Sequence, residues 1–486
     1  MRGKTKQNKM QAVWILASAI FAVMTSVADG RQTDPTVQNT IETRVIVDKH
    51  AFENWQTDLA LPADSDDKGT ADKKTQMTEY IRSLFAGLNA IFKPLEADDI
   101  FVDARIVSIE YIPDEIITKN VFAGKRIHRD MVLKEFKSWL GKKEYTATDH
   151  SVLLTGLDLT GETGNAVAGV ATTKGMCDAH HSLSGVEDSR NGATVIVLAH
   201  ELGHSLGAAH DGSNNACNST SSHIMNAATG KGSTKIFQYS HCSKKYIKDF
   251  LKSLKEKEGG SCLLDTKTDT TKINAKQLGE LYDPDMVCRM TLGNQSYFGR
   301  TLYNPKEYAQ VCTAIWCKHA DGTFSSVVAT DGFPCGRGKK CSLGLCLEAP
   351  SVLPNASDTC PFGDSPSNAD IKNGKSCQQL VTTKNSSPCY QTSASKACCA
   401  SCEAADTGNE ECKYGDKGSF CITFPAAGCY VNSEACCSTC KKQETDDPDC
   451  KYGDKLDTSE CTQQMKKSKR FCENNRPVCC KSCKAK

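Results

Sequence analysis

Residues 200–210 read His-Glu-Leu-Gly-His-Ser-Leu-Gly-Ala-Ala-His, and this stretch fits the pattern H-E-x-x-H-x-x-G-x-x-H. His200 and His204 are four residues apart, so on a helix they lie on one face and can bind one zinc ion together. Gly207 permits the turn that ends the helix, because glycine adopts positive φ at little cost. His210 then becomes the third ligand. Three protein ligands leave one zinc position open, which is typical of a catalytic site.

Glu201 lies between the two helical histidines, where it can act on a zinc-activated water rather than bind the metal. We expect Glu201 to be the general base, which takes a proton from that water and passes it to the leaving amine. The apolar run 193–199 leads directly into the motif and favours a buried helix. The alternative, a chance match, requires five fixed positions to coincide, three of them histidine.

Together with Asp211 directly after it, the motif resembles the adamalysin (reprolysin) branch of the metzincin zinc endopeptidases. Met225, within Ser-His-Ile-Met, is similar to the methionine turn of this family, which implies an apolar floor beneath the metal ligands. His223 replaces a family cysteine, and we expect it to be a turn residue rather than a fourth ligand. The segment 168–177 resembles the family's edge strand, which pairs with substrate backbone. The resemblance implies an α/β (α+β) catalytic domain with a zinc-binding active-site helix.

The same resemblance implies further sites. A calcium site would use Glu42, Asp149, the carbonyl of Cys262 and Asp265, which offer the hard oxygen ligands that calcium prefers. The alternative is that these carboxylates are ordinary solvated groups. The resemblance also pairs Cys177 with Cys262 and Cys217 with Cys242. Sequence by itself leaves that pairing open.

The N-terminus has the pattern of a secretory signal peptide over residues 1–28, with a basic start, an apolar stretch and a small-x-small cleavage site. We expect the mature chain to begin near Asp29, with only a short N-terminal segment, 29–41, and no full propeptide. An unrestrained secreted protease is similar to the salivary and venom metalloproteases of the tick type. No other stretch is apolar enough to predict a membrane span.

Cysteine usage also favours secretion, because the 28 cysteines begin only at Cys177 and their density is typical of an oxidising compartment. A secreted chain can carry glycans at four sequons: Asn218, Asn294, Asn355 and Asn385. The formal net charge is only +1, which argues against nucleic acid as a partner.

The cysteines divide the chain after the metalloprotease domain, 42–265. The region 266–350 resembles the cysteine-rich domain of ADAMTS proteases. Three six-cysteine repeats follow and are similar to PLAC modules; we assign them to 351–403, 404–441 and 442–486. Each repeat is too short for a self-sufficient core, so three disulfides would have to hold it together.

The sequence therefore predicts a secreted zinc metalloendopeptidase with small disulfide-rich modules behind it, whose partners are extracellular protein substrates of the matrix or plasma type. An alternative is a secreted binding or toxin-like protein that acts through its cysteine-rich tail on matrix or cell surfaces. A passive, protease-resistant spacer is a third reading of the tail.

Overall fold

The structure is a computed structural model. It describes residues 38–58, 67–111, 121–122, 125–141, 148–228, 232–264, 275–303, 308–349, 357–366, 375–382, 385–468 and 470–484. The expected signal peptide, Asp265 and the sequon Asn355 lie outside these residues. Among the residues described, no helix combines the length and the apolar character needed to cross a bilayer.

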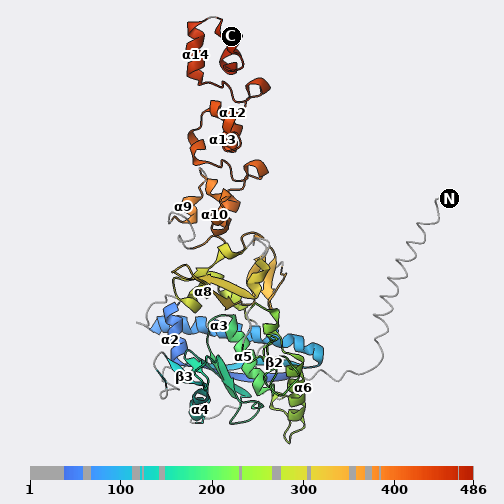
Figure 1. The fold of residues 1–486 in the computed structure, drawn as a ribbon. Helices are drawn as coiled ribbons and strands as arrows, with labels where there is room; N and C mark the ends of the chain where they lie inside the picture. The colour runs from blue at the N-terminus through green and yellow to red at the C-terminus, as the bar shows by residue number, and fades with distance from the viewer. Residues whose placement is uncertain are drawn as a thin grey trace, which may run out of the picture.

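The N-terminal domain is built on a five-stranded sheet with the order β2-β1-β4-β7-β6 (Figure 1). Its strands are β1 (Asn39–Val47), β2 (Val102–Tyr111), β4 (His150–Thr155), β6 (Gly169–Ala171) and β7 (Leu183–Glu187). The four strands β2, β1, β4 and β7 are parallel to one another, whereas β6 pairs antiparallel with β7. The short strand β6 therefore forms one edge of the sheet.

Helices cover both faces of this sheet. Side chains alternate between the faces along a strand, so Val47 packs in one core with α3 (Asp67–Phe92) and α5 (Gly192–Ser205). Ile46 points the other way, into a second core with α4 (Arg129–Leu140). Every residue of β4 is buried, as expected for a parallel strand that is covered on both sides.

Smaller elements complete this domain. They are α2 (Lys49–Asp58), η1 (Lys93–Asp98), β3 (Arg126–His128), β5 (Asp158–Thr160), η2 (Thr234–Phe237), α6 (His241–Lys255) and η3 (Cys262–Leu264). The apolar face of α6 is buried through Ile247, Phe250 and Leu254. Disulfides join Cys177 to Cys262 and Cys217 to Cys242, which are the pairs that the resemblance implied.

The second domain is held by a small core and three disulfides, Cys288–Cys317, Cys312–Cys341 and Cys335–Cys346. Its helices are α7 (Leu278–Leu281), α8 (Pro284–Leu292), η4 (Arg300–Leu302) and η5 (Tyr308–Cys312). Its strands are β8 (Tyr297–Phe298), β9 (Ala314–Lys318), β10 (Phe324–Val328), β11 (Pro334–Gly336), β12 (Lys339–Ser342) and β13 (Leu345–Glu348), which form two small antiparallel sheets.

The two domains meet at the start of α5. A Cβ atom on Gly192, the first residue of α5, would lie 1.9 Å from the carbonyl oxygen of Ala329, so only glycine allows this approach. Asn191 caps α5 by accepting a hydrogen bond from the Ala193 amide, and its Nδ2 donates to Thr291 of the second domain. The active-site helix therefore begins directly against the cysteine-rich domain.

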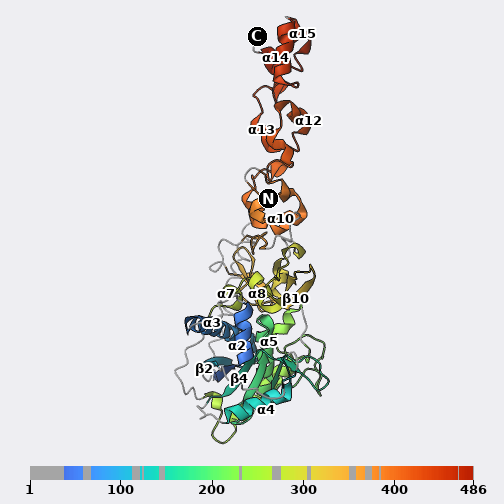
Figure 2. The same cartoon turned by 90° about the vertical axis from the view of Figure 1, so that its left-hand side faces the viewer.

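The tail consists of three modules stacked end to end beyond the second domain (Figures 1 and 2). We call them repeat 1 (360–402), repeat 2 (412–440) and repeat 3 (450–483). In each, the first cysteine pairs with the fifth, the second with the fourth and the third with the sixth. Their helices are α9 (Cys377–Leu380), α10 (Thr392–Ala397), α11 (Cys399–Ala404), α12 (Cys429–Asn432), α13 (Cys437–Lys442), α14 (Thr458–Lys467), α15 (Phe471–Asn475) and α16 (Cys480–Lys484).

The expected fold class, a mixed α/β catalytic domain followed by disulfide-rich modules, is confirmed. All fourteen disulfides of the structure lie from residue 177 onward, and none of the cysteines is free. The first domain relies on its two apolar cores because about 220 residues bury enough surface. The tail modules have little core besides their cysteines, so cross-linking replaces burial there.

Candidate active site

The helix α5 presents the first two candidate ligands from a buried position. Its residues 196–199 are all buried, so the helix is fixed against the sheet along the turn before His200. After Ser205 the chain reverses at Gly207, which has a φ of 95°. The amide of Gly207 donates to the His204 carbonyl and that of Ala208 to the Gly203 carbonyl, which closes the helix end.

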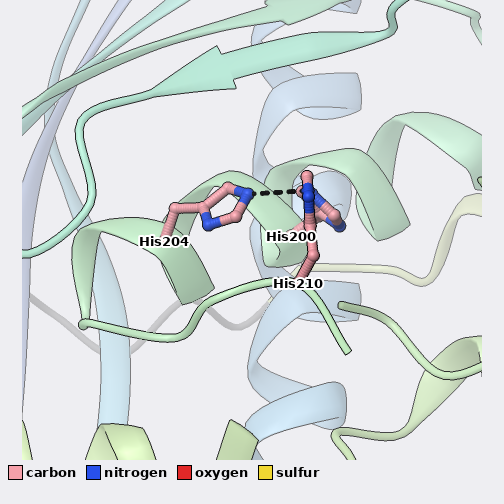
Figure 3. A group of neighbouring side chains, drawn as sticks. All are labelled: His200, His204 and His210. Atoms are coloured by element: carbon pink, nitrogen blue, oxygen red, sulfur yellow. Dashed lines mark hydrogen bonds between the residues drawn. The ribbon is translucent and has the colours of Figure 1, made fainter. Parts of the chain in front are cut away.

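This reversal brings His210 against the two helical histidines (Figure 3). The Nε2 atom of His210 lies 3.1 Å from Nε2 of His200 and 3.1 Å from Nε2 of His204. On the far side of their rings, Nδ1 of His200 lies 2.7 Å from the Ile224 carbonyl and Nδ1 of His204 lies 2.8 Å from the Ala208 carbonyl. A carbonyl only accepts, so both Nδ1 atoms carry the proton and both Nε2 atoms present a lone pair.

Convergent lone pairs repel each other unless a cation lies between them. The three imidazoles therefore fit a metal ion, and the combination of nitrogen ligands with carbonyl partners behind them is typical of zinc. Two other clusters of cysteine and histidine side chains occur among the residues described, at Cys217, His241 and Cys242 and around Cys312. Their cysteines are disulfide-bonded and are not available as thiolate ligands.

The protonation states of the histidines suit metal binding. Burial lowers the pKa of His200 to about 4 and that of His204 to about 3. Burial also lowers the pKa of His210, with a further contribution from the charge of Arg129. Near neutral pH all three rings are therefore uncharged, which is the form that binds a metal.

Glu201 lies beside the histidines with its carboxylate held in an apolar environment. Burial raises its pKa to about 8, and the nearby charge of Arg129 acts in the opposite direction. Its Oε2 atom is buried and makes no hydrogen bond within the described part of the chain. A Cβ atom on Gly169 of β6 would lie 2.6 Å from Oε1, so the carboxylate packs directly on the edge strand. A buried, underused carboxylate with a raised pKa is well suited to accept and return a proton.

Met225 is fully buried beneath the helical histidines. A Cβ atom on Gly203 would lie 2.6 Å from its sulfur, so the thioether packs on the helix between the two ligands. The amide of Asn226 donates to the His223 carbonyl, which forms the turn that carries Met225. His223 itself interacts with the Ser221 hydroxyl at 2.8 Å, as expected for a turn residue.

Several groups that shape the site were not singled out from the sequence. The carbonyls of Ile224 and Ala208 orient the ligands, but backbone groups leave no signature in a sequence. Arg129, at the start of α4, was missed because it is 71 residues before the motif. Gly169 could have been noticed, since a glycine inside an expected edge strand signals a close approach.

Asp211, directly after the third histidine, is 2% exposed and anchors the following helix rather than the metal. Its Oδ1 atom accepts a hydrogen bond of 2.6 Å from the Ser240 hydroxyl, and Ser240 caps α6. Its amide donates to the Met225 carbonyl at 2.9 Å. The residue therefore ties the third ligand to both the methionine turn and α6.

The candidate calcium ligands come partly together. Glu42 and Asp149 are both buried, and the Glu42 amide donates to Asp149 Oδ2 at 2.9 Å. Cys262 lies in η3, which packs against β1, while Asp265 is outside the described residues. Calcium binding here stays a prediction.

The expected glycosylation sites that are described lie at the surface. Asn218 and Asn294 are exposed, and Asn385 is half-buried. The Asn218 carboxamide oxygen accepts hydrogen bonds of 2.8 Å from both the amide and the hydroxyl of Thr220. Glycosylation at these asparagines also stays a prediction.

Comparison with known proteins agrees with this geometry. Residues 40–266 match the reprolysin (M12B) family of zinc metalloproteases, and residues 278–347 match the ADAMTS cysteine-rich domain 2. The chain is 28% identical over 292 residues to the mouse (Mus musculus) protein "A disintegrin and metalloproteinase with thrombospondin motifs 18", covering 58% of this chain and 23% of that one. It is 38% identical over 205 residues to the Caenorhabditis elegans protein "A disintegrin and metalloproteinase with thrombospondin motifs adt-1", covering 41% of this chain and 13% of that one.

Among solved structures, the archaemetzincin of Methanopyrus kandleri aligns with a TM-score of 0.24 at 12% identity, over 46% of this chain and 99% of that one. This overlap is too low to add to the assignment.

The fold, the histidine cluster and the family match together define the class of residues 40–266, which form a domain of the reprolysin (M12B) zinc metalloprotease type. More narrowly, the chain is ADAMTS-like, because a reprolysin domain is followed directly by an ADAMTS cysteine-rich domain. It spans about a quarter or less of the length of the curated relatives it matches.

Proposed function

We propose that this chain is a secreted, zinc-dependent endopeptidase that hydrolyses peptide bonds of extracellular proteins. One observation carries the proposal: three imidazole Nε2 atoms converge beside a buried carboxylate whose Oε2 has no hydrogen bond in the described chain. In this proposal the three histidines form a complete ligand set, and Glu201, next to His200 on α5, is a separate acid–base group.

Each residue has a distinct part in the proposed reaction. His200, His204 and His210 would hold zinc, which when bound supplies Lewis acidity to a water and to the scissile carbonyl. Glu201 takes a proton from the attacking water and delivers it to the leaving nitrogen. The raised pKa of its carboxyl group favours this role, because a group that titrates near neutral pH can accept and donate a proton with comparable ease.

The substrate would bind as an extended strand. Gly169–Ala171 form the sheet edge next to Glu201, and an edge strand leaves one side of its backbone available for pairing with a peptide. A peptide paired there would pass the histidine cluster with its backbone aligned along β6. The absence of side chain at Gly169 allows the carboxylate to approach that backbone.

Secretion and calcium belong to the same proposal. Fourteen disulfides and no free cysteine support an oxidising compartment, and hence an extracellular location. Extracellular matrix or plasma-type proteins would be the substrates. A calcium ion bound near Glu42 and Asp149 would reinforce the contact between β1, the start of β4 and η3.

The test is cleavage of casein, gelatin and fibrinogen by the chain from residue 29 to residue 486, produced in a secretory host. We expect cleavage, abolished by a zinc chelator and restored by added zinc. Glu201→Ala should retain stoichiometric zinc but lose activity by about 100- to 10,000-fold, the usual contribution of a general base.

A folded, zinc-loaded protein that cleaves none of the three would contradict the proposal in its general form. Activity that survives in Glu201→Ala would contradict the assigned base. Activity that survives chelation, with zinc removal verified by metal analysis, would contradict the metal-dependent mechanism.

A further inference from the structure

The three repeats are joined by a recurring contact. The residue after the third cysteine of repeat 1 is Tyr390, and its hydroxyl donates to the Gly415 carbonyl at 2.8 Å and accepts from the Tyr414 amide at 3.1 Å. The rings of Tyr390 and Tyr414 meet edge to face at 5.3 Å. Tyr414 and Gly415 belong to the Cys-Lys-Tyr-Gly-Asp-Lys opening of repeat 2. We call the side of a repeat that carries the residue after its third cysteine its far face. The far face of one repeat therefore binds the opening turn of the next repeat.

The contact between repeats 2 and 3 has the same form. The Tyr430 hydroxyl donates to the Gly453 carbonyl at 2.8 Å and accepts from the Tyr452 amide at 3.2 Å. Repeat 3 differs at the corresponding place, because Glu473 follows its third cysteine. Glu473 is exposed and has no phenol ring. Repeat 3 therefore lacks the tyrosine hydroxyl that bonds to the next repeat at the other two positions.

The same face of repeat 3 is rich in positive charge. Between the second and third cysteines, repeat 2 has no charged residue at all (422–428), whereas repeat 3 has Lys466, Lys467 and Arg470 within the described residues. Arg476 follows at the end of α15. Lys466 and Lys467 close α14, which packs on α15, and Arg470 and Arg476 flank α15. Six residues of helix span about 9 Å, so Arg470 and Arg476 lie close together along α15, which packs against the helix that carries Lys466 and Lys467.

These four cations are exposed, and none of them has an ion-pair partner in the described part of the chain. Two other cations of the repeat are ion-paired: Lys451 pairs with Glu444 at 3.0 Å, and Lys484 pairs with Asp447. A lysine in the last turn of a helix interacts favourably with the helix dipole, which can account for Lys466 and Lys467. This interaction does not account for Arg470 or Arg476.

We propose that the far face of repeat 3, formed by Lys466, Lys467, Arg470 and Arg476, is a binding site for a sulfated polysaccharide of the extracellular matrix. A linear polyanion fits because it offers closely spaced anionic groups along one direction and releases counterions when it meets several cations. The site lies at the end of the stalk farthest from the sheet (Figures 1 and 2), so a bound polysaccharide would leave the histidine cluster free. This inference goes beyond the proposed proteolysis and does not depend on it.

The test measures retention of the whole chain on immobilised heparin at about 0.15 M salt, the physiological ionic strength. We expect retention that falls steeply with added salt, and no retention on desulfated heparin. The double variant Lys466→Glu with Lys467→Glu should bind heparin at least about tenfold more weakly, because two counterion-releasing contacts are reversed.

The matched control is Lys441→Glu with Lys442→Glu in repeat 2. These are also two adjacent exposed lysines in the last turn of a short helix, with the same change of charge. The control should keep heparin binding within about twofold. Thermal unfolding and far-ultraviolet circular dichroism of both variants report folding, so this test is separate from the test of the proposed protease.

Three outcomes would overturn the proposal. The first is no retention of the unmodified chain at 0.15 M salt. The second is an equal loss in the control pair, which would indicate diffuse charge attraction. The third is binding to vesicles that contain phosphatidylserine without binding to heparin, which would indicate a membrane surface instead.

Discussion

At the scale of single residues, the lack of a Cβ atom at Gly169 determines where the Glu201 carboxylate can lie. Glu201 is buried against β6 because Gly169 has no side chain in its path. The same contact excludes water from the carboxylate, and this burial is the main cause of its raised pKa. The proposed general base therefore depends on a residue that performs no chemistry.

We expect Gly169→Ala to lower kcat by about 10- to 100-fold, because a displacement near 1 Å at a catalytic group costs on that order. The new Cβ would lie 2.6 Å from Glu201 Oε1 and 2.7 Å from Val197 Cγ1. Steady-state peptide cleavage and zinc analysis measure the effect, and the zinc content should not change. Gly185→Ala on the neighbouring strand is the control, since its Cβ would meet Val132 at 2.8 Å instead. Equal loss of kcat in both variants would contradict a specific effect on Glu201.

The histidines predict a second property at this scale, which is stabilisation by the metal. Without a cation, the Nε2 lone pairs of His200 and His204 both point at Nε2 of His210 at 3.1 Å. Zinc would bind this folded arrangement better than the unfolded chain, so we expect its removal to lower the free energy of unfolding.

Chelation should therefore lower the temperature of thermal unfolding, by an amount equivalent to about 3 kcal/mol when zinc was present at 100 times its Kd. Calorimetry with and without chelator measures the shift. His204→Ala should unfold at the same temperature in both conditions. A chelator effect that persists in this variant would mean that the stabilising metal lies elsewhere.

At the scale of the elements, the strand β7 combines packing with an unusual carboxyl group. Glu187 ends β7, and its Oε2 accepts a hydrogen bond of 3.2 Å from the Leu159 amide. Burial raises the pKa of Glu187 to about 7, and the charges of Asp158 and Asp188 add to this effect. The next residue, Asp188, is a structural anchor, which accepts hydrogen bonds from Tyr80 at 2.6 Å and Trp55 at 3.1 Å.

The raised pKa of Glu187 predicts a pH-dependent stability. The folded state holds the proton up to about pH 7, whereas the unfolded chain releases it near 4.5. The stability that protonated Glu187 contributes to the folded state is therefore fully present below about pH 4.5 and is lost as the pH rises through 7. Glu187→Gln keeps an acceptor for Leu159 without a charge.

We expect Glu187→Gln to be more stable than the unmodified protein at pH 8, by up to about 3 kcal/mol, and equally stable at pH 4.5. Denaturant unfolding at the two pH values measures this difference. Glu53→Gln on α2 serves as a control for removing one carboxylate, and the same pH dependence in that variant would contradict the assignment to Glu187.

At the scale of the whole molecule, glycine carbonyls connect the modules. In the second domain, Arg300 donates to the carbonyls of Phe362 and Gly363 in repeat 1, at 2.8 and 3.0 Å. Its guanidinium is fixed by Asp285 at 2.6 Å. Gly363 holds the same place in its repeat as Gly415 and Gly453, so each of the three joints uses the opening turn of a repeat. The tail is therefore a stack of modules with specific contacts between neighbours, rather than a series of modules connected only by linkers.

Tyr430→Ala should loosen the joint between repeats 2 and 3 by about 2 kcal/mol, the sum expected for a lost aromatic pair and two hydrogen bonds. Small-angle X-ray scattering of the whole chain should then show a broader distribution of intramolecular distances. Val431→Ala, at a neighbour that is 85% exposed, is the control. An unchanged distance distribution in Tyr430→Ala would contradict the role of this tyrosine.

Much of the site could be predicted from the sequence because its chemistry depends on local spacing. His200, Glu201 and His204 share one helix, and Gly207 determines how soon His210 can return to them. The methionine turn and the disulfide pairs were predicted from the family resemblance rather than from spacing. The grouping of the cysteines indicated the order of the modules, since each module carries its own cross-links.

The sequence by itself determined the predicted class of chemistry, the candidate metal ligands, the proposed base and the predicted modular order, because these depend on residues that are close in the chain. Only the tertiary structure decided which carbonyls orient the histidines, that Gly169 makes room for Glu201, how the repeat cysteines pair and that Tyr390 and Tyr430 lock the stalk. These contacts join segments that are distant in sequence or involve backbone groups. They arise when the chain packs, and no local pattern of residue types specifies them.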